Sequence, residues 1–264
     1  MPDRTRVFPA LLNYWRRRRG MSQLDLALAA EISSRHVSFL ETGRSRPSHG
    51  MILLLGSVLD MPLREQNVML REEGHPPAYP EPPLDGLADP VVERTLDLLL
   101  RTHEPFPVMI LDRGYSVLRL NRAAEKMVTF TLGGVPEGLN IVRAFFDPNG
   151  FKPFILDWDT IAREAIARLH REALRTPNND GLAALRDEVL AMPGVPDTWR
   201  EPDFSRGTEG ALAVRFLAGG QTFSFLTMLT VFQAPQNVTL EELQIETYLP
   251  ADDETEQACR SMLS

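Results

Sequence analysis

The stretch QLDLALAAEISSRHVSFLET, from Gln23 to Thr42, decides the fold of the first part of the chain. Its small and apolar residues recur where two short helices that cross steeply must bury their side chains, and Ala27 is small where such helices approach most closely. Glu31 stands at the turn, where a positive φ usually selects glycine, at a cost of about 1 kcal/mol. The pattern predicts a helix-turn-helix with these inward positions: Leu26, Ala30, Ile32, Val37 and Leu40.

Helical periodicity continues on both sides of this stretch. An apolar stripe precedes it, serines that can cap helices stand before its two helices, and two further apolar stripes follow it. The three stripes run over Phe8 to Trp15, Met51 to Leu59 and Leu63 to Glu73. Residues 1–74 are therefore predicted to form an all-α bundle of five helices.

The charge of the chain is distributed unevenly. The net charge is −8, but residues 1–50 hold nine arginines against four acids. A basic segment around a helix-turn-helix is typical of proteins that bind double-stranded DNA. Arg35 has the fork geometry that reads guanine, and nearby polar groups can reach other bases or phosphate. The predicted contacts with operator DNA are Gln23, Ser33, Ser34, Arg35, Ser38, Arg44 and Arg46.

A proline-rich stretch follows the predicted bundle. Six prolines fall between Gly74 and Pro90, a density that neither a helix nor a central strand tolerates. Residues 75–90 are therefore predicted to be a semi-rigid linker.

Residues 91–264 change from a helical to an alternating pattern. Two predicted hairpins, over 108–121 and 211–233, and a strand over 244–249 surround helical stretches. The three helical stretches are 122–127, 158–175 and 182–192. This order predicts an α+β domain with a five-stranded antiparallel sheet, so the whole chain has two domains.

Composition excludes several classes of protein. The single cysteine, Cys259, cannot form an intramolecular disulfide or a multi-cysteine metal site. No apolar run approaches the roughly 18 residues that span a membrane, and the N-terminus has no secretory apolar core, so a cytoplasmic location is expected. We find no catalytic motif and no phosphate-binding loop, and we therefore expect neither an enzyme nor a bound cofactor.

Several longer phrases resemble one family. LLNYWRRRRGMSQLDLALAAEISSRHVSFLETGRSRPS, which begins at Leu11, is similar to the XRE or lambda-repressor-like bacterial regulators, in the branch whose second domain is named after the MmyB regulator. The motifs LNRAAEKM, NIVRAFFDP, DWDTIAR, MPGVPDTW and QNVTLEELQIETYLPAD also resemble that family, so the resemblance covers nearly the whole chain. It implies a transcription regulator with a PAS-like ligand-binding domain, and a structural pair between Arg16 and Glu41.

The second domain is rich in aromatic residues, since eleven of the thirteen phenylalanines lie there. Ligand pockets are mostly apolar with a few polar anchors, so we expect a small apolar ligand, a fatty acid being the favoured class, between the sheet and the helices of 158–192. Arg143 is the first candidate for a carboxylate anchor and Asn121 the second. The predicted ligand-binding residues are Asn121, Arg143, Phe146, Phe154, Trp158, Phe223 and Phe225.

Two further expectations concern partners. Specific operator affinity usually comes from two half-sites read by a two-fold dimer, so a homodimer is expected. The alternative to a ligand-binding domain is a docking or dimerisation surface that binds no ligand. The size of any cavity in residues 91–264 distinguishes these two interpretations.

Overall fold

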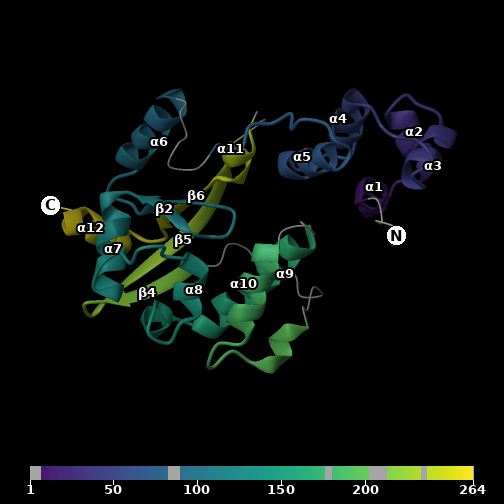
Figure 1. The fold of residues 1–264 in the computed structure, drawn as a ribbon. Coiled ribbons are helices and arrows are strands. Elements are labelled where there is room, and N and C mark those ends of the chain that lie inside the picture. The colour runs from purple at the N-terminus through teal and green to yellow at the C-terminus, as the bar shows by residue number, and fades with distance from the viewer. Residues whose placement is uncertain (1–6, 83–89, 176–179, 202–212, 233–236, 264) are drawn as a thin grey trace. The chain divides into compact units, whose positions relative to one another are not determined.

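The structure is a computed structural model that describes residues 7–82, 90–175, 180–201, 213–232 and 237–263 (Figure 1). The chain divides into two compact units. The first comprises residues 1–86 and 233–241, and the second comprises residues 87–232 and 242–264.

Five helices occur within residues 7–82, as the sequence predicts. Serine side chains cap three of them: Ser22, Ser33 and Ser48 accept hydrogen bonds of 3.1–3.2 Å from backbone N–H groups three residues ahead. Such caps satisfy helix N-termini that otherwise lack acceptors. The helices are α1 (Val7–Arg18), α2 (Gln23–Ala29), α3 (Ser34–Glu41), α4 (His49–Val58) and α5 (Leu63–Glu72).

The α2–α3 pair has the predicted helix-turn-helix geometry. Four of the five inward positions are buried, and the fifth, Ile32, is half-buried against the same core. Ala27 is also buried, at the contact between the two helices. Glu31 has a φ of 54°, so the left-handed turn expected at this position is confirmed with glutamate in place of glycine.

The first part of the predicted linker is folded onto α5. Asn67 is fully buried, and its side-chain oxygen accepts hydrogen bonds from the backbone of Ala78 and Tyr79 at 3.0 and 3.1 Å. Glu81 forms salt bridges of 3.0 Å with Arg64 and Arg71 on the same helix. Residues 75–82 are therefore part of the first unit, whereas residues 83–89 lie outside the described residues.

A short helix from late in the sequence also packs in the first unit. Most of α11 (Val238–Glu242) belongs to this unit, although it connects two strands of the second. The buried Val238 anchors the helix. Three hydrogen bonds attach it: Val238 N to Pro80 O (3.0 Å), Thr239 Oγ1 to Pro82 O (2.6 Å) and Leu63 N to a Glu241 carboxylate oxygen (2.8 Å).

The second unit contains one antiparallel sheet, as predicted, with the strand order β2-β1-β6-β5-β4-β3. The sequence predicts five strands and the structure has six. The additional strand, β3, has only two residues and pairs with the edge of β4. Two residues are too few to show the alternation of apolar and polar side chains that predicts a strand. The strands are β1 (Val108–Leu111), β2 (Val117–Leu120), β3 (Ile155–Leu156), β4 (Ala213–Ala218), β5 (Gln221–Val231) and β6 (Gln244–Pro250).

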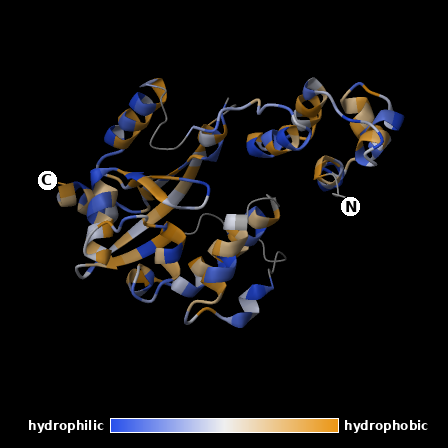
Figure 2. Cartoon of the chain, in the orientation of Figure 1, coloured by the Kyte–Doolittle hydropathy of each residue, from blue (hydrophilic) through white to orange (hydrophobic). Residues whose placement is uncertain are grey.

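Helices cover this sheet, and Figure 2 shows hydrophobic residues concentrated on the strands with mixed faces on the helices around them. Helices α7 and α12 contact each other and the sheet, while α8 and α9 both contact α10 (Figure 1). Three of these helices, α6, α8 and α12, were not predicted. The helices are α6 (Pro90–Thr102), α7 (Arg122–Leu132), α8 (Ile141–Phe146), α9 (Trp158–Arg175), α10 (Asp180–Leu190) and α12 (Asp253–Leu263).

Candidate DNA interface and ligand cavities

The N-terminal turn of α3 presents the groups that the sequence analysis assigned to DNA. Ser34 and Arg35 are exposed there, and the Arg35 guanidinium lies 5.2 Å from the centre of the Phe39 ring. Arg44 and Arg46, just after α3, are also exposed, while Ser38 is half-buried. A helix with free N-terminal side chains and flanking arginines has the form that enters a major groove.

Two of the predicted DNA contacts have structural partners as well. The Ser33 hydroxyl caps α3 through the His36 backbone N–H, and the Gln23 amide donates to a Glu41 carboxylate oxygen at 2.8 Å. Each group is therefore held in place at the edge of the helix-turn-helix.

Arg16 and Glu41 form the pair that the family resemblance implies, which confirms that expectation. The guanidinium donates to both carboxylate oxygens, at 2.5 and 3.0 Å, and also to the Met21 carbonyl at 2.7 Å. Asn13 and Gln23 add hydrogen bonds to the same carboxylate. Burial alone would raise the pKa of Glu41, but these hydrogen bonds and the Arg16 charge hold it below its ordinary value.

The larger cavity of the second unit, about 680 Å³, lies between α7, the Met262 end of α12 and strands β4 and β5. Its volume is within the range of small-molecule sites. Arg122, Glu125 and Lys126 are exposed yet line this cavity, so they stand at its opening. The Lys126 ammonium group also donates to the Met262 carbonyl. The apolar wall consists of Met127, Phe130, Phe216, Phe223, Phe225 and Met262.

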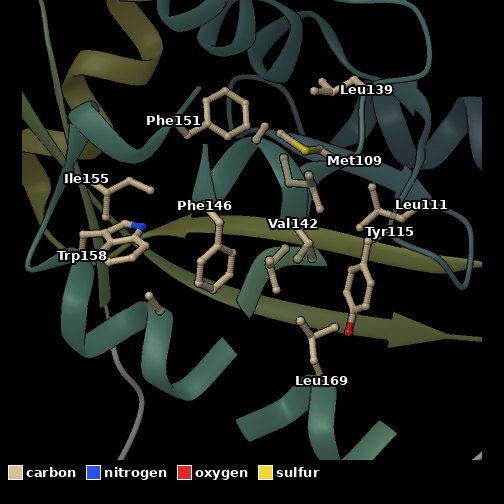
Figure 3. Close-up of a cluster of buried hydrophobic side chains, with 14 of the residues drawn as sticks. Met109, Leu111, Tyr115, Leu139, Val142, Phe146, Phe151, Ile155, Trp158 and Leu169 are labelled. Carbon is tan, nitrogen blue, oxygen red and sulfur yellow. The ribbon is translucent and has the colours of Figure 1, made fainter. Parts of the chain in front are cut away.

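A second cavity, of about 260 Å³, lies between the sheet and helices α8 and α9. Phe216 borders both cavities. The second cavity combines aromatic side chains, including Phe146, with the charged groups of Arg168 and Glu246. Figure 3 shows Phe146 and Val142, two of its lining residues, between the strands and helix α9.

Burial shifts the pKa values of two titratable groups that line the second cavity, Glu246 and Tyr248. Burial raises the pKa of Glu246, although the Arg168 charge and a hydrogen bond with Tyr248 oppose the shift. Burial also raises the pKa of Tyr248 well above its ordinary value, with Glu246 adding to the effect. The Tyr115 hydroxyl, on the same side of the sheet, donates to Glu172 at 2.6 Å.

Both predicted anchors are engaged elsewhere. Arg143 is half-exposed, and its Nε donates to both Glu188 carboxylate oxygens at 2.8 and 2.9 Å, so it bridges α8 to α10 and lines neither cavity. The buried Asn121 caps α7 through Ala124 N, and it also bonds Val108 N and Phe106 O. Neither residue lines either of the two cavities described above, and their role as ligand anchors stays a prediction.

The predicted aromatic residues divide among three environments. Phe223 and Phe225 line the larger cavity and Phe146 lines the smaller one. Trp158 is packed in the core, where its indole N–H donates to Phe145 O at 2.9 Å (Figure 3), and the half-buried Phe154 lies in the short 3₁₀ helix Lys152–Phe154. Neither of these two lines a cavity described above, and the larger cavity is not where we expected the ligand.

Sequence reasoning missed the charged groups that do line the cavities. Arg122 and Lys126 are four residues apart, so they share one face of α7. That spacing could have pointed to a paired cationic site, whereas nothing local marks Arg168 among the many charged residues of α9.

The two units together define a class of protein: a helix-turn-helix unit joined to an α+β ligand-binding domain. Comparison with family models agrees, since residues 12–66 match the helix-turn-helix model and residues 92–262 match the MmyB-like transcription regulator ligand binding domain. The chain belongs to this family of MmyB-like transcription regulators.

Other comparisons add little. No curated protein matches the chain. A solved structure titled as an RNA-binding light-oxygen-voltage receptor is similar at 15% identity and a TM-score of 0.31, over 96% of this chain and 56% of that one. The chain thus spans little more than half of that receptor, and the likeness supports no conclusion about fold or function. Within the described residues, no helix is long and apolar enough to cross a membrane.

Proposed function

We propose that this protein binds operator DNA through α3 and that an apolar acid, a fatty acid being the favoured class, modulates this binding from the larger cavity of the second unit. The observation that carries the proposal is a large, mostly apolar cavity whose opening has two cationic side chains beside one acid, Glu125, in a chain that also has a helix-turn-helix. This combination of features supports the function of a regulator and not that of an enzyme.

The DNA part of the proposal assigns different roles to two exposed arginines. Arg35, on the first turn of α3, would read a guanine edge, because a guanidinium can donate to both acceptors of that base. Arg44, beyond the end of the helix, would contact phosphate, which carries no sequence information. A second copy of the chain would supply the second half-site, and a homodimer is therefore part of the proposal.

The ligand part rests on the chemistry of the larger cavity. An acyl chain would lie against Phe223 and Phe225, whose rings stack 6.2 Å apart. Its carboxylate would reach the opening, where Arg122 and Lys126 offer positive charge. Met127 in the wall can adapt to chains of different shape because thioether side chains are flexible.

Helix α11 supports the coupling between ligand and DNA. Strand β5 carries Phe223 and Phe225 and precedes α11 in the sequence, while Glu241 of α11 accepts a hydrogen bond from the first turn of α5 in the DNA-binding unit. A ligand that favours one arrangement of β5 would therefore change the contact between α11 and the first turn of α5. Binding matters only if the guest has different affinities for the two arrangements.

The test has two parts. Purified protein would be extracted with organic solvent and searched for fatty acid by mass spectrometry, and then C12 to C18 fatty acids would be added while melting temperature and operator affinity are measured. The Arg122→Gln/Lys126→Gln variant should weaken acid binding by about tenfold or more. Arg94→Gln, which removes an exposed cation on α6 that does not line this cavity, is the matched control.

If no acid is found and none changes either quantity, a docking surface becomes the better interpretation of the second unit. Exposed apolar residues on α6 favour that alternative specifically, since Val91 is 72% exposed and Leu98 is 52% exposed.

A further inference from the structure

Two of the charged residues that line the smaller cavity, Arg168 and Glu246, attract each other but do not form a salt bridge with each other. Arg168 reaches it from α9 and Glu246 from β6. The salt bridge that Arg168 makes within the described residues is a long one, 3.9 Å to Glu172. Its Nε is out of reach of solvent and has no hydrogen-bond partner among them.

Such an arrangement is costly when the cavity holds no matching guest. The buried Nε of Arg168 lacks an acceptor, although its side chain is 39% exposed. The half-buried Glu246 loses part of its hydration, which the Arg168 charge and Tyr248 offset only in part. The Tyr248 hydroxyl shares a hydrogen bond with Glu246, but this bond does not provide an acceptor for the Arg168 Nε. A guest that brings an anion to Arg168 and a cation to Glu246 would satisfy both groups at once.

The rest of the cavity is small and mostly apolar, although Glu164 and Arg171 also line it. Val142, Phe145, Phe146 and Phe216 line it, and its volume of about 260 Å³ lies just below the range of drug-sized sites. The guest should therefore have a compact apolar side chain next to its two charges. Long acyl chains fit the larger cavity better.

We propose that the cavity between the sheet and helices α8 and α9 is a second ligand site, which binds a small zwitterion of the α-amino acid class with an apolar side chain. The carboxylate of the guest pairs with Arg168 and its ammonium group with Glu246. The side chain packs among the phenylalanines. This site is independent of the fatty-acid site proposed above, since its charged residues line only the smaller cavity.

The decisive experiment uses the full-length wild-type protein and a matched series of small molecules. L-phenylalanine and L-leucine should bind saturably in calorimetry and raise the melting temperature. N-acetyl-L-phenylalanine, which lacks the ammonium group, and phenethylamine, which lacks the carboxylate, should each bind at least about tenfold more weakly. The proposal is overturned if no amino acid binds, or if either analogue binds as well as L-phenylalanine.

Two substitutions assign the charges. Glu246→Gln should abolish the preference for L-phenylalanine over its N-acetyl analogue, and Arg168→Gln should abolish the preference over phenethylamine. The measured quantity is the ratio of two affinities. A general loss of stability would weaken the binding of both molecules and leave this ratio unchanged. If either variant fails to fold, the wild-type series still decides. An unchanged ratio in a folded variant contradicts the assignment.

Discussion

Replacing Glu41 by glutamine tests how much the buried ion pair of the first unit contributes to its stability. Glu41 is 3% exposed and Arg16 is 9% exposed at the side chain, so the substitution leaves a guanidinium charge buried without its counter-ion. Breaking one partner of a buried pair costs about 3–5 kcal/mol. Because about 1.4 kcal/mol changes an equilibrium tenfold, we expect opening of the helices to become about two to three and a half orders of magnitude more frequent.

Hydrogen exchange followed by mass spectrometry measures this in the full chain, because peptides from α1 and α3 report on the first unit alone. Glu31→Gln is the matched control: it makes the same chemical change at an exposed position in the same unit and should alter stability by less than about 0.5 kcal/mol. The Arg16→Met/Glu41→Gln double variant should lose less than the two single variants together. Acceleration of less than about tenfold in α1 and α3 would refute the reasoning.

The other predictions follow from single groups. Glu41 has a lowered pKa in the folded state, so its contribution is present above its unfolded pKa and is lost as pH falls through the lower folded value. A pH series of protection factors, which are corrected for the intrinsic exchange rate, should fall less steeply with acid in Glu41→Gln than in the wild type. Arg35→Ala should relax operator preference at one base pair by about 1–3 kcal/mol, whereas Arg44→Ala should weaken all sequences alike and reduce the salt slope. Cys259 is buried, and burial raises the pKa of its thiol to about 11, so alkylation by iodoacetamide at neutral pH should be slow until urea unfolds the chain. Light scattering at high micromolar concentration should detect a dimer, and a strictly monomeric chain with and without operator would exclude it.

Local sequence was enough to predict the helix-turn-helix. Its inward residues, its serine caps and the strained turn at Glu31 all depend on residues a few positions apart, and the structure has them where the spacing placed them. The alternating pattern likewise predicted the main strands of the second unit. It missed β3, because a strand of two residues has no periodicity.

The binding residues of the second unit depended on tertiary structure. Arg143 is the one charged residue of α8, whereas Arg168 lies on the charge-rich α9, and the sequence analysis favoured the first. The fold places Glu188, 45 residues away, against Arg143, while the Arg168 Nε has no hydrogen-bond partner among the described residues. Similarly, α11 joins the DNA-binding unit through contacts with residues more than 150 positions earlier. Sequence determines which groups a helix carries, but which of them faces a cavity is decided by neighbours that only the folded chain brings together.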